Sequence, residues 1–128
     1  MKKLFVVLAA LVLGACARTI YNVDQPIPAG AQALPMDRIE MLIVEAGKTR
    51  HWTFEHAGSG HLIATQAQGG RVAVVNIMFD QNRWRIDRRS TTGMSAEGGA
   101  FHSQYNSWVR NLELDISTRL ANAAVFAR

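Results

Sequence analysis

Residues 71–90 read "RVAVVNIMFDQNRWRIDRRS", and this stretch decides the fold. In residues 71–80 one face of a strand is wholly apolar, made of every second side chain: Ala73, Val75, Ile77 and Phe79. Gln81 and Asn82 form a tight turn, and residues 83–90 return with Trp84 and Ile86 inward. The stretch therefore predicts an antiparallel hairpin with one buried face.

Two more strands precede this hairpin. In residues 51–56, "HWTFEH", the aromatic side chains share one face and the polar ones the other. Residues 61–68 form the next strand after a turn at 57–60, and Gly69-Gly70 turns the chain into residue 71. Four short strands joined by brief turns are typical of an antiparallel meander.

Helical patterns flank the meander. Pro35 suits a first helical position and Gly47 suits the stop, and the apolar residues between them have helical spacing: Ile39, Leu42, Ile43 and Ala46. Residues 91–99, rich in glycine, predict a loop. The longest helix follows over residues 100–120, with a long apolar stripe: Phe101, Tyr105, Trp108, Val109, Leu112, Ile116 and Leu120.

One face of the sheet is the simplest cover for both apolar stripes. We therefore predict an α+β fold, a two-layer sandwich in which a four-stranded antiparallel meander carries two helices on one face (αββββα). The predicted domain spans residues 35–121, and residues 122–128 form a C-terminal tail.

The N-terminus has the pattern of a cleaved export signal over residues 1–15. Two lysines precede an apolar run, residues 4–15, which is shorter than the ~20 residues of a membrane-spanning helix. Residues 17–34 contain two prolines and no lasting periodicity, which indicates a flexible tether. The alternative is a short edge segment, in which the apolar side chains of this stretch pack on the domain: Ile20, Tyr21 and Val23.

The apolar run closes on Leu13-Gly14-Ala15-Cys16, which holds the only cysteine of the chain. This sequence resembles the lipobox of bacterial lipoproteins. The resemblance implies that the Cys16 thiol carries a diacylglycerol, that the signal is cut just before it, and that the new amine is acylated too. Two or more acyl chains are sufficient for a stable membrane anchor. The alternative is an ordinary export signal with a coincidental cysteine.

In Gram-negative lipoproteins a residue other than Asp after the cysteine implies release to the outer membrane, and here it is Ala17. The resemblance thus implies a protein anchored by lipid at the periplasmic face of the outer membrane. Residues 16–34 then form the lipidated cysteine and its tether.

A second resemblance rests on residues 101–109, where His102, Tyr105, Asn106 and Trp108 form a His-x-x-Tyr-Asn-x-Trp pattern. Together with Trp52, Gly58, Gly60 and the "VAVVNIMF" strand, it resembles a family of small proteobacterial lipoproteins of uncharacterised function, over roughly residues 38–120. The resemblance implies the helix–meander–helix layout and a place in the cell envelope. It implies no catalytic residues.

The charge of the chain does not favour nucleic acid as a partner. The formal charge is +4, but residues 1–15 contribute two lysines, so the mature chain carries about +2. With Cys16 modified no disulfide can form, and the stability of the domain must come from its core.

The sequence predicts neither an enzyme nor a cofactor or metal site. His51, His56 and His61 recur at a spacing that alternates the faces of a strand, so they do not converge on one ion. There is no Gly-x-Ser-x-Gly nucleophile elbow and no glycine-rich phosphate loop between a strand and a helix.

Two groups of residues are candidates for binding a partner. Arg83, Arg85 and Arg89 should face solvent on the sheet side away from the helices, either as a solvated surface that guards an edge strand or as a shallow site for an anionic or acidic partner. On the last helix, His102 and Asn106 lie one turn apart beside Tyr105. They either cap the helix start or line a polar pocket floored by Tyr105 and Trp108.

We therefore expect a lipid-anchored envelope protein that acts as a structural or interaction module, with an envelope protein or the cell wall as its partner. The alternative is a binder of a small hydrophobic or lipidic ligand between sheet and helices. A filled core favours the first function, and an apolar cavity of about 300 Å³ or more favours the second. An enzyme would need a cleft in which His102 meets another titratable group.

Overall fold

The computed structural model describes residues 20–94 and 100–126, with backbone only for residues 100–102. The export signal and Cys16 lie outside the described residues. The elements follow one another along the chain as β1 (Val23–Pro26), η2 (Ala29–Ala31), α2 (Met36–Lys48), β2 (Thr53–Gly58), β3 (His61–Gln68), β4 (Arg71–Phe79), β5 (Arg83–Thr92) and α3 (Ala100–Phe126).

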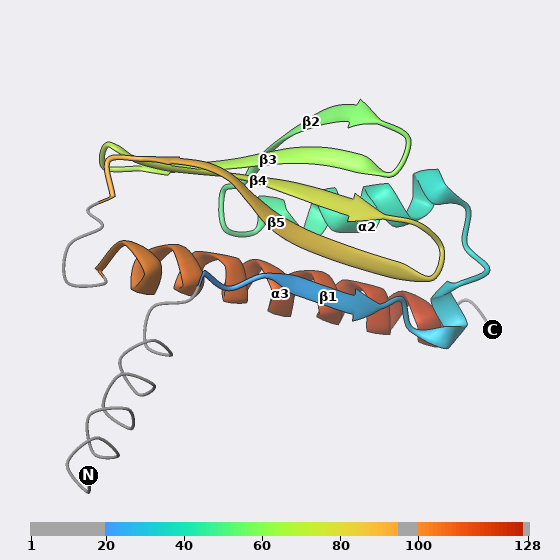
Figure 1. Ribbon diagram of the computed structural model, residues 1–128. Helices are drawn as coiled ribbons and strands as arrows, with labels where there is room; N and C mark the ends of the chain where they lie inside the picture. Colours follow the sequence, from blue (N-terminus) through green and yellow to red (C-terminus); the bar gives the residue numbers. More distant parts are fainter. Residues whose placement is uncertain (1–19, 95–99, 127–128) are drawn as a thin grey trace, which may run out of the picture.

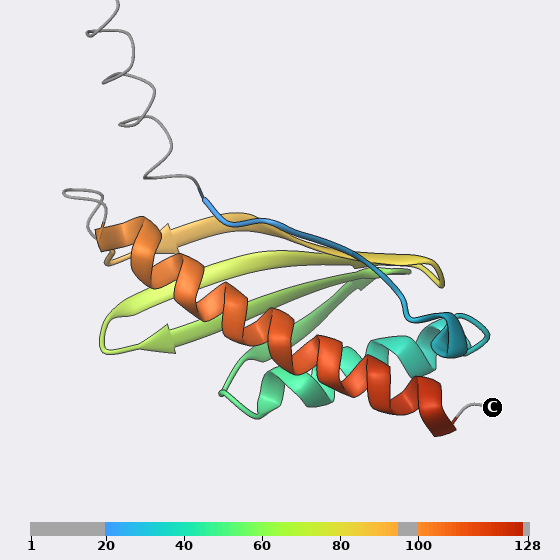
Figure 2. The ribbon, with the colours of Figure 1, turned by 90° about the horizontal axis from the view of Figure 1, so that it is seen from below.

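The strands form one open antiparallel sheet in the order β1-β5-β4-β3-β2, and α2 and α3 lie together on one of its faces (Figure 1; Figure 2). The predicted α+β class and antiparallel meander are therefore confirmed. The predicted number of strands is wrong, because a fifth strand, β1, pairs with β5 and forms the edge.

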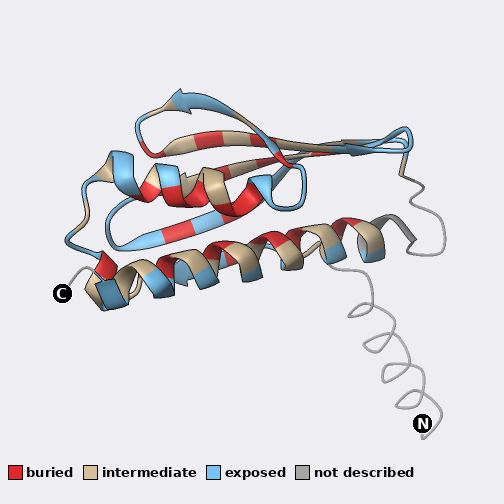
Figure 3. Ribbon diagram, turned by 180° about the vertical axis from the view of Figure 1, so that it is seen from behind, coloured by how far each residue is buried: buried red, intermediate tan, exposed pale blue. Residues whose placement is uncertain are grey.

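The core fills the space between the sheet and the two helices, as the buried stripe along α3 indicates (Figure 3). Alternate residues of β4 and β5 point into it, with Phe79 opposite Trp84 and Ile77 opposite Ile86. The largest fully buried side chains come from every layer of the fold: Trp52, Trp84, Tyr105, Ile27, Ile39, Ile43, Leu62, Ile77, Ile86, Leu112, Ile116 and Leu120.

The prediction of a flexible tether up to residue 34 is wrong for residues 20–34, which pack on the domain. Val23, Ile27 and Ala31 are buried, and the Ile27 N–H donates a hydrogen bond of 2.8 Å to the Asn82 carbonyl. The stretch has no period of its own because its apolar residues belong to a short strand, a connection and a 3-10 turn in succession. Its place is determined by β5, with which it pairs.

Tyr21 ties the start of this segment to α3. Its backbone N–H donates to Asn106 Oδ1 at 2.8 Å, and its hydroxyl donates to the Glu113 carboxylate. Gln25 Nε2 donates to the other carboxylate oxygen of Glu113 at 3.1 Å, and the Arg110 guanidinium lies 4.8 Å from the Tyr21 ring centroid. These contacts hold β1 against the helix layer as well as against the sheet.

Gly47 is not the helix stop that the sequence predicts. It is a buried residue inside α2, which ends one residue later. A Cβ at Gly47 would lie 2.2 Å from Cζ of Phe54, so this glycine provides room for the Phe54 ring from β2. His51 is not in a strand but in the turn after α2, with a positive φ of 69°.

The C-terminal boundary also differs from the prediction, because α3 continues to Phe126 where a tail from residue 122 is expected. The reason is a contact with the N-terminal segment. A Cβ at Gly30 would lie 2.5 Å from the Ala124 carbonyl oxygen, so η2 packs closely on the last turns of α3.

Candidate functional site

The sheet face away from the helices is uncovered, and we call it the open face. The register places on it the side chains that alternate with the buried ones on the three central strands: His61, Ile63, Thr65, Val72, Val74, Asn76, Met78, Arg83, Arg85 and Asp87. Its middle is apolar, with Ile63, Val74 and Met78 half-buried among their neighbours. The arginines of β5 border this apolar strip.

Arg83 lies where β5 begins, in an ion pair with the edge strand. Its Nε and Nη2 atoms are 3.0 Å and 2.9 Å from Asp24 Oδ1. The preceding turn is closed by Asp80, whose Oδ1 accepts from the backbone N–H groups of Arg83 at 2.8 Å and Asn82 at 2.7 Å. These hydrogen bonds lower the pKa of Asp80. β5 is thus an inner strand, and its arginines do not guard an edge.

Arg89 reaches the open face because β5 bulges opposite Val74 and Val75. Its Nη1 donates to Asn76 Oδ1 at 3.2 Å, and the same oxygen lies 2.9 Å from His61 Nε2. The bulge therefore brings an arginine and a histidine together on one asparagine at the centre of the sheet. Nothing in the local pattern of β5 predicts this cluster, since the shift in register depends on pairing with β4.

Arg85 is exposed and makes no hydrogen bond with a described residue. It lines a hollow of about 390 Å³ at the end of the open face, together with Asp24, Met78 and Arg83. Of the three predicted arginines, Arg83 and Arg85 share this hollow, whereas Arg89 lies in the separate cluster on Asn76.

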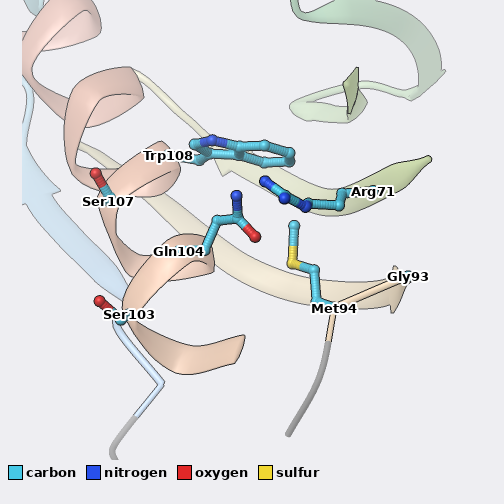
Figure 4. Close-up of a pocket in the computed structure, with 7 residues that line it drawn as sticks. All are labelled: Arg71, Gly93, Met94, Ser103, Gln104, Ser107 and Trp108. Atoms are coloured by element: carbon cyan, nitrogen blue, oxygen red, sulfur yellow. The ribbon is translucent and has the colours of Figure 1, made fainter. Parts of the chain in front are cut away.

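A second hollow, of about 720 Å³, lies where α3 begins (Figure 4). In it the Arg71 guanidinium lies beside the Trp108 ring, with the Gln104 amide and Met94 nearby. Gly93 belongs to its wall and has a φ of 72°, which favours glycine. A Cβ there would lie 2.1 Å from the Gly70 carbonyl oxygen, so the ends of two hairpins touch at this point.

The predicted residues of the last helix do not form one site. Tyr105 is fully buried and faces the sheet, and this burial raises the pKa of its hydroxyl. Asn106 accepts the Tyr21 N–H and thus fixes the N-terminal segment. Of the pocket floor that the sequence predicts, Trp108 lines the hollow but Tyr105 does not. The side chain of His102 lies outside the described residues.

The described residues contain no group of three or more histidine, cysteine or acidic side chains that would hold a metal ion. His56 instead forms an ion pair with Glu40, with Nδ1 3.0 Å from Oε1. None of the helices in the described part of the chain combines the length and the apolar character needed to cross a membrane.

Comparison of the chain with protein-family models, with curated proteins and with solved structures finds no match.

Proposed function

We propose that this protein is a lipid-anchored envelope protein whose domain binds a partner through the open face and performs no catalysis. The lipobox-like sequence at Cys16 and the Ala17 that follows it support anchoring in the outer membrane, with the domain in the periplasm. The partner is an envelope protein or the cell wall. The resemblance to small proteobacterial lipoproteins supports the same assignment.

One observation carries the binding role. The helices cover only one face of the sheet, and the other face combines a half-buried apolar strip with arginines at its border. Such a surface suits a partner that covers the apolar strip while its acidic groups meet the arginines. Asp24 and Asn76 hold Arg83 and Arg89 in defined positions, which lowers the entropy cost of recognition.

The interior gives no comparable support to the alternative of a lipidic ligand between sheet and helices. Bulky side chains occupy this space, with Trp84 1% and Tyr105 0% exposed. The two largest hollows described above lie at the surface, and polar side chains contribute to both linings.

The anchor is tested first. Metabolic labelling with palmitate should mark the wild-type protein, and Cys16→Ser should abolish the label and release the protein from the membrane fraction. Unlabelled wild-type protein, or a Cys16→Ser variant that still sediments with membranes, contradicts the anchor.

The open face is tested by photo-crosslinking in cells. A crosslinking amino acid replaces Thr65, which lies on the open face, or Thr118, which is exposed on the outer side of α3. We expect one discrete product from position 65 that is absent from position 118 and is lost in the Arg83→Glu/Arg85→Glu variant. Identical products from both positions, or a product that survives the charge reversal unchanged, contradict the role of the open face.

A further inference from the structure

The proposed anchor lies very close to the folded domain. The chain is packed on the domain from Ile20 and Tyr21 onward, so only residues 17–19 separate Cys16 from it. Four residue steps span at most about 14 Å, whereas a free tether up to residue 34 would span about 60 Å. A lipidated Cys16 would therefore hold one particular end of the domain next to the lipid headgroups.

That end is the one at which α3 begins. Tyr21 contacts Asn106 and Arg110 in the first half of α3, and β1 runs from there toward the opposite end of the helix (Figure 1; Figure 2). Because β1 pairs antiparallel with β5, with Val23 opposite Ile86, the residues before Val23 lead toward the far end of β5.

Arginines from three elements gather at this end, which we call the arginine end: Arg71 from β4, Arg88 and Arg89 from β5, and Arg110 from α3. The described carboxylates among them are Asp87 and Glu113, and Glu113 already accepts hydrogen bonds from Tyr21 and Gln25. Trp108 and Met94 line the hollow beside Arg71 (Figure 4). A partly exposed tryptophan ring is typical of protein surfaces at the level of lipid headgroups.

The opposite end of the domain has the reverse balance of charge. The hollows around Ser59 are lined by Asp24, Asp37, Glu40 and Asp80, against two arginines, Arg83 and Arg85. The charge of the described chain is thus polarised along its long axis, with the positive pole at the end from which the N-terminal segment leads toward Cys16.

We propose that the arginine end docks on anionic phospholipid headgroups of the membrane that holds the Cys16 acyl chains. This inference rests on the proposed anchor, and it adds an orientation to it. Each arginine near an anionic surface strengthens membrane association about five-fold. Docking at this end directs the Ser59 end away from the bilayer and leaves the open face accessible from the side.

The test uses the lipidated full-length protein in vesicles of phosphatidylglycerol and phosphatidylethanolamine that carry a headgroup-bound quencher. Cys16 is blocked by its lipid, so a cysteine introduced at an exposed serine is the single site for a fluorophore. Ser107→Cys places it at the arginine end, and Ser59→Cys places it at the opposite end. We expect quenching at position 107 to exceed quenching at position 59 several-fold.

The matched charge variants are Arg71→Gln/Arg110→Gln at the arginine end and Arg38→Gln/Arg119→Gln beside the other end of α3. The first pair, or vesicles of phosphatidylcholine alone, should make quenching at the two positions nearly equal, whereas the second pair should leave the difference unchanged. Equal quenching at both positions in the unaltered protein, or stronger quenching at position 59, overturns the orientation while leaving the anchor intact. Protein without palmitate that does not float with the vesicles overturns both.

Discussion

Replacing Ile27 with alanine tests whether the N-terminal segment is part of the core. Ile27 is 1% exposed and follows the edge strand directly. The substitution removes three buried carbon atoms, which costs about 2.4 kcal/mol in transfer free energy, and the remaining cavity raises the loss to about 3 kcal/mol or more. For a domain of this size such a loss lowers the melting temperature by about 12 °C or more.

The assay is urea unfolding followed by tryptophan fluorescence, since Trp52 and Trp84 are buried in the native state. Leu114→Ala on α3 is the control, because Leu114 is 58% exposed and its truncation should change the free energy of unfolding by no more than about 0.5 kcal/mol. A loss below about 1 kcal/mol for Ile27→Ala, similar to the control, would show that residues 20–34 are a tether after all.

Three further predictions concern backbone geometry and the two tyrosines. Gly93→Ala should destabilise the domain by more than about 1 kcal/mol in urea unfolding, because of its positive φ and the 2.1 Å approach to Gly70, whereas Gly69→Ala, with a φ of 59° and no close neighbour, should cost less. Tyr21→Phe removes a hydrogen bond to a carboxylate on α3 and should cost about 1 kcal/mol in the same assay, and an unchanged stability would contradict the tie between β1 and α3. The hydrogen bond raises the pKa of Tyr21 and burial raises that of Tyr105, so the unfolded chain releases these protons at lower pH than the folded one. The free energy of unfolding should therefore be constant below about pH 10 as far as these groups matter and fall above it, and tyrosinate absorbance of the folded protein near pH 10 should stay well below that of the protein in urea.

The sequence predicts the central part of the fold because its information there is local. In β4 and β5 the alternation of apolar side chains defines the face that is buried, and short turns leave antiparallel pairing as the simplest arrangement. The apolar stripe of α2 likewise defines the face that meets the sheet, and Ile39 and Leu42 are both buried as predicted.

The candidate site is predicted less well, because it depends on where neighbouring elements lie. Tyr105 belongs to the same apolar stripe as Leu112, and only packing shows that its ring is in the core instead of in a pocket. Arg89 reaches Asn76 through a bulge, whose position depends on the register between β4 and β5. Alternation along β5 does place Arg83 and Arg85 on the open face, as the sequence predicts.

By itself, the sequence determined the class of the fold, the central strands, the helix faces and the lipobox-like start at Cys16, since each of these is a pattern within a few residues of chain. Only the tertiary structure decided that residues 20–34 join the domain, that β1 is the edge strand, and that one end of the molecule gathers the arginines. The physical reason is that these features depend on contacts such as that of Tyr21 with Asn106, which are 85 residues apart in the chain and leave no periodic trace in either segment.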